Sequence, residues 1–529
     1  MSWRATRATR SAEEAQQIAV IDLGSNSWRL VVYSYGETPA PWWRQTDELY
    51  EPVRIAAGVD EHGALSAAAI ERGLETLTVF ERFCRSQGLG PDRVHAFATS
   101  AIREAPNRRS FLRRVSHQTG QHVELLSAKQ EAHYGYVAVI NSTTLSDGVV
   151  LDIGGGSMQL VRVTDRAEHE RASFPVGAVR MTERFLSGGD PRRPARRKDM
   201  QRLRAHVERS IWGTGWLRGR GGRLVGTGGA VRNLAAAAQR RSLELAAATD
   251  IGVQGFVIAA AVLDEIVDEL AALPVVERRT VPGIKPGRSD IILAAALTLQ
   301  TVVRVGEFDG IEATESGLRD GIFLARTILG EQHPLFADVR ESAVRNLAVQ
   351  YESDLVHTEH VTRLALQMFD SLADAGLLTA VAGERELLWA AAMLHDVGVT
   401  IAYDDHHKHS RYLIASAALP GFDPRERALI AQIARYHRKG TPKLGEWAPL
   451  ARPGDDVLLA RCALILRLAE HLERGRDQSV SEVRLLRKGD GVAMRLRAAG
   501  DLTLPRWSVE RYGDDEAFAR VFGRPLVID

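Results

Sequence analysis

The residues best suited to chemistry in this chain are aspartates, glycines and small polar residues that recur together in two short segments. Asp22 and Asp152 each lie at the end of an apolar run, and each precedes a turn rich in glycine, serine or asparagine and then a second apolar run. Glycine lets the backbone turn sharply and bring N–H groups toward an anion, and a carboxylate at a strand end can hold Mg²⁺, usually through water. The pattern predicts two strand–loop–strand units that clamp a phosphate chain between two lobes.

A third glycine turn supports this interpretation. Gly228 and Gly229 lie between an apolar run and an alanine-rich segment, where a helix would begin with free N–H groups and a positive dipole end. The residues that we expect to bind phosphate are Gly24, Ser25, Asn26, Ser27, Gly154, Gly155, Gly156, Ser157, Gly228 and Gly229. The alternative is a pair of ordinary β-hairpins whose aspartates accept N–H bonds inside their own turns. Two copies with Asp, Gly and Ser in register favour phosphate binding.

Length and composition indicate a globular chain with several domains. A chain of 529 residues with 45% hydrophobic and 26% charged residues should hold three or four domains. The net charge of +1 gives no general attraction to nucleic acid. Cys84 and Cys462 are the two cysteines, which suggests neither a disulfide framework nor a zinc site. Because we find neither a signal-peptide core nor a long unbroken apolar run, we expect a cytoplasmic location and no contact with a membrane.

The order of predicted elements divides the chain into five parts. We expect a flexible arm over residues 1–16, an α/β domain over 17–140, a second α/β domain over 141–330, an all-helical domain over 335–478, and a small α+β domain over 479–529. Within the α/β domains, apolar periodicity predicts helices at 65–86, 110–119, 198–216, 253–273, 290–302 and 318–329. We expect the last of these to cross back to the first domain. Alternation predicts strands at 483–486 and 492–496 near the end of the chain.

Six segments together resemble the exopolyphosphatase/guanosine-pentaphosphate phosphohydrolase (Ppx/GppA) family. They occur in the family's order, at 21–30, 99–107, 126–132, 151–157, 226–229 and 316–321. The resemblance implies two actin-like α/β domains of the actin–sugar kinase–Hsp70 class. Segments at 393–398, 406–410 and 435–440 further resemble the long form of this family, which carries a helical HD-like domain. The chain departs from the pattern at Gln130, where relatives often have a second acid, and at Glu473, where an HD ligand aspartate is expected.

The resemblance also implies roles for residues in the cleft. Glu131 matches the general base of the family, and Arg103 can form two hydrogen bonds to a phosphate. Asp22 and Asp152 are the acids expected to hold Mg²⁺ or Mn²⁺. Without the resemblance, Glu131 would be interpreted as a glutamate that only stabilises a helix N-terminus through the helix dipole. Arg103 would be interpreted as a solvent-exposed side chain.

The helical domain leaves three interpretations open. In the first, His357, His395 and Asp396 form a metal site of the HD type, and His409 and His437 are also of types that could bind a metal. In the second, a basic wall holds a long anion, formed by His409, Arg435, His437, Arg438 and Lys439. The third is a packing role for His395. The altered acid at Glu473 favours the basic wall.

The expected activity is hydrolysis of a phosphoanhydride. We expect an exopolyphosphatase that releases terminal phosphate processively from inorganic polyphosphate, because local basic clusters suit a long anionic chain. The alternative is a phosphohydrolase acting on guanosine pentaphosphate, and further alternatives are a kinase of the same fold or a nucleotide-binding regulator. The resemblance also implies a homodimer.

Overall fold

The computed structural model describes residues 15–57, 63–242, 251–513 and 515–528. The chain divides into two compact units, and each is described separately below. The first contains residues 1–244 and 255–339, and the second contains 245–254 and 340–529. No helix in the described part of the chain has both the length and the apolar character needed to cross a bilayer.

The first unit begins with a five-stranded sheet in the order β3-β2-β1-β4-β5. Its strands are β1 (Gln16–Leu23), β2 (Trp28–Gly36), β3 (Trp42–Glu51), β4 (Val94–Ala98) and β5 (Val123–Leu125). The first three strands are antiparallel, whereas β4 and β5 run parallel to β1. Alternate residues of β1 pack into two different cores, Ile21 on one face of the sheet and Val20 on the other, as the two-residue period of a strand requires.

A second sheet repeats this plan with six strands in the order β10-β11-β9-β6-β7-β8. Its strands are β6 (Gly148–Ile153), β7 (Met158–Thr164), β8 (Ala167–Phe174), β9 (Arg223–Thr227), β10 (Val257–Ala259) and β11 (Gly310–Ala313). Strands β6, β7 and β8 form an antiparallel meander, and β9 and β11 continue the sheet in parallel to β6. The turn between β1 and β2 and the turn between β6 and β7 therefore occupy equivalent places in the two sheets.

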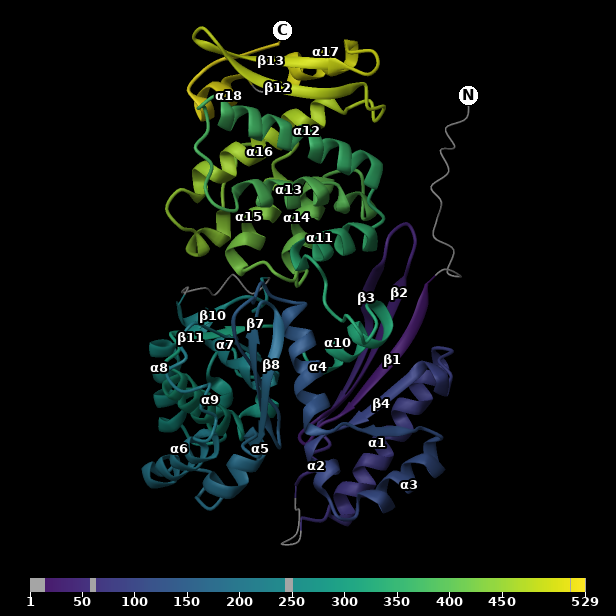
Figure 1. Ribbon diagram of the computed structural model, residues 1–529, viewed down its shortest axis with the longest axis vertical. Helices are drawn as coiled ribbons and strands as arrows, with labels where there is room; N and C mark the ends of the chain where they lie inside the picture. Colours follow the sequence, from purple (N-terminus) through teal and green to yellow (C-terminus); the bar gives the residue numbers. More distant parts are fainter. Residues whose placement is uncertain (1–14, 58–62, 243–250, 514, 529) are drawn as a thin grey trace. The chain divides into compact units, whose positions relative to one another are not determined.

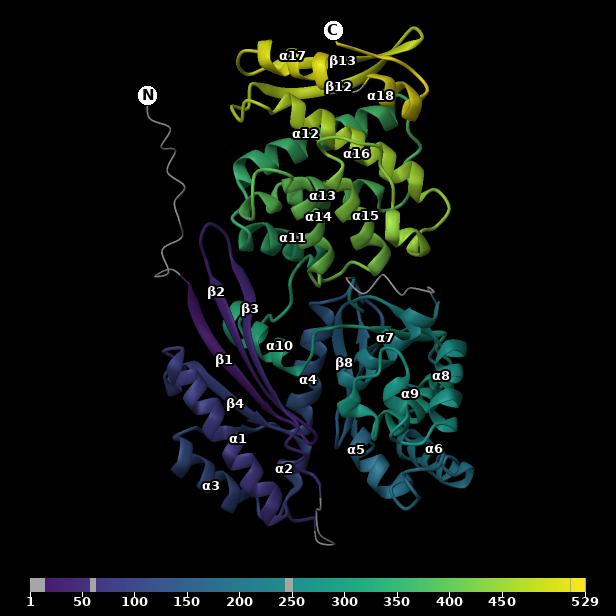
Figure 2. The same ribbon diagram turned by 180° about the vertical axis from the view of Figure 1, so that it is seen from behind.

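Helices cover both sheets of the first unit (Figures 1 and 2). Helices α1 (Ala67–Ser86) and α3 (Arg108–Thr119) pack together beside the first sheet, while α6 (Arg197–Ile211), α7 (Gly229–Ser242), α8 (Ala260–Ala272) and α9 (Ile292–Gly306) accompany the second. Short helices α2 (Ser100–Glu104) and α5 (Ala178–Met181) follow β4 and β8.

Two helices join the sheets. Helix α4 (Ala128–Ile140) packs on β6, β7 and β8 of the second sheet, although it follows β5 of the first. Helix α10 (Leu318–Phe323) packs on α4 and on β1, and Phe323 stacks on Tyr33 with ring centroids 4.1 Å apart. Since one core contains side chains of both sheets and both helices, the two halves of this unit share a continuous interior.

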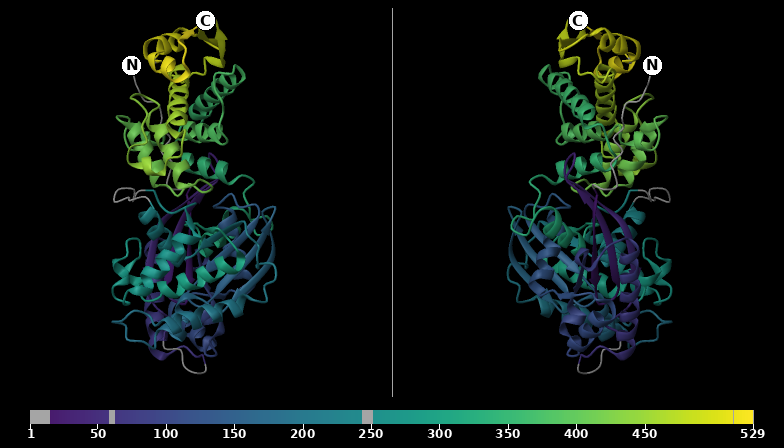
Figure 3. Two further views of the ribbon diagram at one scale, coloured as in Figure 1. Left: turned by 90° about the vertical axis from the view of Figure 1, so that its left-hand side faces the viewer. Right: turned by 90° about the vertical axis from the view of Figure 1, so that its right-hand side faces the viewer.

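The second unit is a bundle of helices capped by a small sheet (Figure 3). Its helices are α11 (Val339–Gln350), α12 (Leu355–Asp374), α13 (Glu384–Leu394), α14 (His406–Ser416), α15 (Pro424–Arg435) and α16 (Asp455–Leu472). Strands β12 (Val480–Lys488), β13 (Gly491–Ala498) and β14 (Leu526–Ile528) form the sheet, with α17 (Thr503–Tyr512) and α18 (Asp515–Phe522) beside it. Strand β12 packs on α12 and α17 packs on α16, so the sheet and the bundle form one compact unit.

Two of the predicted helices differ from the structure. The helix expected at 198–216 ends at Ile211, because Gly213 and Gly215 follow in a run of turns. The segment predicted as helix over 253–273 begins instead with β10, which pairs with β11, and the helix starts at Ala260. Apolar spacing alone did not separate a three-residue edge strand from the helix that follows it. The arm expected over residues 1–16 lies largely outside the described residues.

Candidate active site

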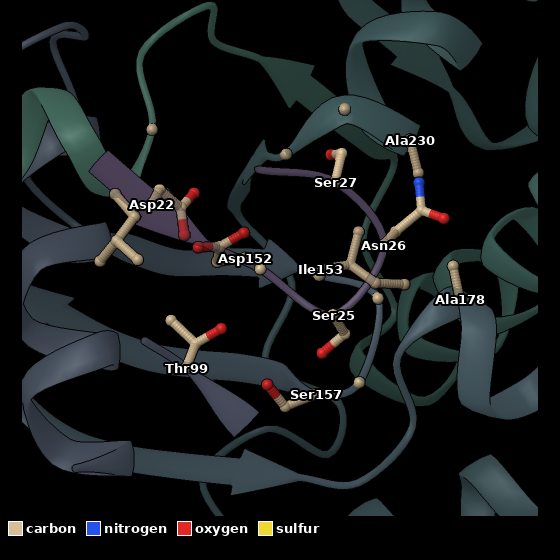
Figure 4. Close-up of a pocket in the computed structure, with 18 of the residues that line it drawn as sticks. Asp22, Ser25, Asn26, Ser27, Thr99, Asp152, Ile153, Ser157, Ala178 and Ala230 are labelled. Atoms are coloured by element: carbon tan, nitrogen blue, oxygen red, sulfur yellow. The ribbon is translucent and has the colours of Figure 1, made fainter. Parts of the chain in front are cut away.

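The turns of the two sheets line one cavity in the first unit. The ten glycine-loop residues predicted to bind phosphate all line it, together with Asp22, Asp152 and Glu131. The cavity lies between the β1–β2 turn, the β6–β7 turn and the N-terminus of α7 (Figure 4). The structure thus brings together three segments that are far apart in the sequence.

The two aspartate loops approach each other closely. Ser25 Oγ lies 3.2 Å from Ser100 Oγ, and a Cβ atom added at Gly156 would lie 2.4 Å from the Ser100 hydroxyl and 2.8 Å from the Ser25 hydroxyl. A side chain at residue 156 would therefore separate the loops. Gly228 adopts a φ of +104°, and its added Cβ would lie 2.6 Å from the Ile153 carbonyl oxygen. Residue 228 must therefore adopt a positive φ and also leave no room for a Cβ atom, and only glycine does both.

The start of α4 positions Glu131 in this cavity. Ser127 caps the helix by accepting a hydrogen bond from the Gln130 N–H, and the Gln130 side chain accepts from the Ser127 N–H, which closes a capping box. Gln130, which departs from the family pattern, is thus a helix-capping residue with an exposed side-chain contact. Glu131 follows in the first helical turn, with only 8% of its side chain exposed.

Two side chains hold the Glu131 carboxylate. Arg103 Nη1 donates to one oxygen at 2.7 Å, and the Ser157 hydroxyl donates to the other at 3.3 Å. Burial raises the pKa of Glu131, while the Arg103 guanidinium opposes that shift. The result is a carboxylate with a raised pKa, fixed in orientation and directed into the cavity.

The structure revises the expectation for Arg103. Its Nη1 donates to both the Glu131 carboxylate and the Leu126 carbonyl, at 2.7 and 2.8 Å, and Arg103 is not among the residues that line the cavity. Its side chain is therefore engaged with the expected base, and its geometry supports a role in positioning Glu131 in place of a direct phosphate contact.

Asp22 and Asp152 supply a second pair of carboxylates. Figure 4 shows the two groups pointing toward one another from β1 and β6. Burial raises the pKa of Asp152 to about 7, with Glu131 and Asp22 adding to the shift. Burial also raises the pKa of Asp22, against the opposing charge of Arg319, which donates to it at 3.0 Å. Carboxylates that repel one another in a buried cavity fit a divalent cation, and their hard oxygen atoms suit Mg²⁺ or Mn²⁺.

Four arginines complete the cavity lining and were not among the predicted site residues. They are Arg29, Arg232, Arg288 and Arg319. Burial and repulsion from the other three lower the pKa of Arg232 to about 10. The buried Asn26 Nδ2 also has no hydrogen-bond partner in the described structure. Crowded guanidinium groups and an unpaired N–H donor fit an anion such as phosphate. Arg29 and Arg319 lie within two of the segments that resemble the family, at 21–30 and 316–321, so the sequence could have pointed to them. No spacing rule identifies Arg232 or Arg288.

In the second unit, the predicted His357, His395 and Asp396 lie together. His357 Nε2 is 3.8 Å from one Asp396 oxygen, and His395 Nε2 is 3.7 Å from the other. The acid nearest to both histidines is Glu470, with Oε2 at 3.1 Å from His357 and 3.3 Å from His395. The expectation that Glu473 takes this place is wrong, since its carboxylate lies 3.3 Å from His360 Nε2.

The residues of the expected basic wall do not all lie on a surface. His437 is 1% exposed and lies beside His406, so it belongs to the histidine cluster and cannot contribute to a solvent-facing wall. Arg435 ends α15, and Arg438 and Lys439 follow in the next turn. Among them, the Lys439 ammonium helps Lys408 and His407 to lower the pKa of the nearby Asp405 carboxyl. Arg435, Arg438 and Lys439 form a basic patch, while His409 is partly buried on α14.

Comparison with known proteins identifies the family. The Ppx/GppA phosphatase family matches residues 47–328, and domain III of Ppx/GppA phosphatases matches residues 339–503. The chain belongs to the Ppx/GppA phosphatase family. The match to domain III agrees with the helical unit, and the expected class of two actin-like α/β domains followed by helices is confirmed.

Two curated relatives are similar to this Ppx/GppA protein over nearly their whole length. A guanosine-5'-triphosphate,3'-diphosphate pyrophosphatase from Vibrio vulnificus is 27% identical, with 91% of this chain and 92% of the relative covered. A protein of the same name from Vibrio parahaemolyticus is 26% identical, over 93% and 95% of the two chains. The crystal structure of an exopolyphosphatase from Cytophaga hutchinsonii is 21% identical, with a TM-score of 0.52 over 59% of this chain and 97% of that one. This last likeness supports the fold.

The contact between Arg103 and Glu131 predicts how the reaction rate depends on pH. A general base works in its ionised form, so the reaction rate should fall as the pH drops through the pKa of Glu131. Because the Arg103 guanidinium lowers that pKa, Arg103→Gln should move the acid limb of kcat/KM to higher pH, and Arg103→Lys should restore part of the shift. The measurement is a pH–rate profile of each variant beside the exposed control Arg109→Gln. An acid limb that stays at the wild-type pH in Arg103→Gln would contradict the positioning role.

Proposed function

We propose that this protein is an exopolyphosphatase that removes terminal phosphate groups from inorganic polyphosphate in the cavity of its first unit. The observation that carries the proposal is the buried Glu131 carboxylate, oriented by Arg103 and Ser157 beside three glycine loops. Phosphoryl transfer depends on positioned groups and on positive charge around the transferred phosphoryl, and this cavity supplies both.

In the proposed reaction, Glu131 accepts a proton from water as the water oxygen attacks the terminal phosphorus. The bond to the bridging oxygen then breaks, and the shortened chain takes the electron pair as a terminal phosphate oxygen. Backbone N–H groups of the glycine loops and the guanidinium groups of Arg232 and Arg288 would hold the phosphate oxygens. Asp22 and Asp152 would hold Mg²⁺ or Mn²⁺, which neutralises charge on the phosphate when bound.

The composition of the cavity supports polyphosphate as the substrate. None of its lining residues is aromatic, and the polar groups that line it are hydroxyls, amides, carboxylates and guanidinium groups. Such a surface binds phosphate oxygens but offers no ring on which a guanine base could stack.

Guanosine pentaphosphate is the second candidate substrate. It is favoured by the names of the two Vibrio relatives, which align with this chain over more than nine-tenths of its length. A nucleotide could enter this cavity with its triphosphate alone. Phosphate release from long polyphosphate, tripolyphosphate, guanosine pentaphosphate and ATP, measured side by side, separates the candidates. A higher kcat/KM for guanosine pentaphosphate than for long polyphosphate would overturn the polyphosphate proposal, and transfer of phosphate from ATP to an acceptor would indicate a kinase.

The basic patch of the second unit predicts a dependence on chain length. Replacing Arg435, Arg438 and Lys439 by glutamine should raise KM for long polyphosphate and leave tripolyphosphate nearly unchanged, because only a long anion can contact residues outside the cavity. The effect should shrink with added salt. The matched control is Arg487→Gln, Arg511→Gln and Arg520→Gln, which removes three exposed positive charges elsewhere in the unit. Equal losses at every chain length would contradict the prediction.

We also propose a homodimer, as the resemblance implies, and a location in a reducing cytoplasm. Both cysteines are buried and free, which suits such a compartment. Light scattering coupled to gel filtration measures the oligomeric state.

A further inference from the structure

The second unit contains a buried cluster of histidines and acids that the proposed reaction does not use. Asp396 lies at its centre and belongs to two groups of side chains: His357 with His395, and His406 with His437. Within each group the nitrogen and oxygen atoms lie within 4.8 Å of one another. Glu470 adds a second carboxylate next to the first group. All of these residues except Glu470 are at most 7% exposed.

Backbone contacts fix the orientation of three of these rings. His395 Nδ1 lies 2.6 Å from the Ala392 carbonyl oxygen, and His437 Nδ1 lies 2.6 Å from that of Ala434. His406 Nδ1 has the same contact with the carbonyl of Tyr403 at 2.8 Å. A carbonyl oxygen can only accept, so each Nδ1 carries the proton and donates. In the neutral imidazole, each Nε2 atom therefore presents a lone pair to the cluster.

These lone pairs meet without a donor between them. His406 Nε2 lies 3.1 Å from His437 Nε2 and 3.2 Å from an Asp396 carboxylate oxygen, so three acceptors converge. In the other group, His395 Nε2 is completely buried and has no hydrogen-bond partner in the described structure, while a Glu470 oxygen lies 3.3 Å away. Buried acceptors in such contact repel one another unless a cation lies between them.

The spacing of the atoms suits a transition metal ion. Metal–nitrogen distances of about 2.0–2.1 Å place tetrahedral ligand atoms about 3.4 Å apart. The contacts of Asp396 and Glu470 with the four histidines range from 3.1 to 3.9 Å. An Nδ1–H bonded to a backbone carbonyl is also the usual support of a histidine that binds metal through Nε2.

We propose that this cluster is a metal centre with two positions for divalent first-row transition metal ions, and that Asp396 is shared between them. His357, His395 and Glu470 complete one position, and His406 and His437 complete the other. The imidazole ligands favour ions such as Co²⁺, Zn²⁺ or Fe²⁺ over Mg²⁺, which prefers oxygen ligands. The centre is distinct in its chemistry from the oxygen-rich cavity of the first unit and does not depend on the proposed substrate.

The competing explanation is an ion-pair network without metal. Arg476 Nη2 donates to Asp396 at 2.7 Å, and a proton on one histidine could supply the remaining positive charge. This explanation requires no metal binding by the cluster, so a binding measurement separates the two.

The experiment uses the full-length protein without a histidine tag, stripped with a chelator and titrated with Co²⁺ in excess Mg²⁺. The magnesium occupies oxygen-only sites, and the visible absorption of Co²⁺ reports imidazole ligands. We expect two tightly bound Co²⁺ ions per chain, and X-ray absorption of the wild-type protein should show imidazole nitrogen in their ligand shell. His437→Gln and His395→Gln should each weaken one of the two ions by about 10–100-fold or more.

The matched control is His360→Gln, which removes a buried histidine of the same unit that faces Glu473. It should keep both ions, and circular dichroism should show that all three variants retain their helices. Absence of tight Co²⁺ binding by the wild-type protein, or a cobalt spectrum without imidazole ligands, would overturn the proposal. Tight binding of a single ion would show that the cluster has only one metal position and would overturn the proposed two-ion centre. Because X-ray absorption is measured on the wild-type protein, it tests the proposal even if a variant fails to fold.

Discussion

Glu131→Gln is expected to lower kcat for phosphate release by about 10²–10⁴-fold, which is the usual loss when a general base is removed. Glutamine preserves the size of the side chain and can still contact Arg103 and Ser157, so the fold and the KM for tripolyphosphate should change little. The raised pKa of Glu131 adds a second expectation, since the acid limb of the wild-type pH profile should lie above the normal range of a glutamate. Steady-state kinetics over a pH series measures both effects.

The control for this variant is Glu104→Gln. Glu104 also forms an ion pair with an arginine, Arg180 at 2.7 Å, but its side chain is 48% exposed and it is not part of the cavity lining. It should keep wild-type turnover. Wild-type turnover in purified Glu131→Gln would rule out Glu131 as the base, and an equal loss in both variants would point to a general effect of removing charge.

Much of the first unit could be predicted because its signals are local. Asp22 and Asp152 end buried strands and precede glycine turns. This repeated pattern predicted both loops, and that they bind the same phosphate chain, without any knowledge of the sheets. Ser127 and Gln130 mark the start of α4 in the same way, and they set the position of Glu131 one residue later. Such features depend on a few neighbouring residues.

The roles that sequence did not reveal depend on distant contacts. Nothing near Arg103 shows that its guanidinium meets Glu131, 28 residues later, and nothing near Arg232 or Arg288 places them in the same cavity. Likewise, Glu470 and Glu473 lie one turn apart on the end of one helix, and only the packing of α12 against α16 decides which of them faces His357. A one-turn choice of this kind is a matter of tertiary packing, which periodicity does not resolve.

Removal of metal is expected to abolish phosphate release, and Asp152→Asn is expected to raise the Mg²⁺ concentration for half-maximal activity by about 10–100-fold. A strand-end aspartate often holds Mg²⁺ through a metal-bound water rather than directly. Loss of a group that contacts only the direct ligands of a metal typically weakens metal binding by this amount. The measurement is phosphate release at a series of Mg²⁺ concentrations. Asp147→Asn is the matched control, since Asp147 is exposed just before the start of the same strand.

The pKa of Asp152 makes this prediction specific. Burial raises that pKa to about 7, with Glu131 and Asp22 adding to the shift, so a proton competes with the metal for this carboxylate below about pH 7. The wild-type enzyme should therefore need more Mg²⁺ as the pH falls through this range, whereas Asp152→Asn, which has no group to protonate there, should lose that part of the pH dependence. Full wild-type activity in excess chelator would refute the metal requirement. A Mg²⁺ demand in Asp152→Asn that matches the wild type at every pH would show that Asp152 serves only to shape its turn.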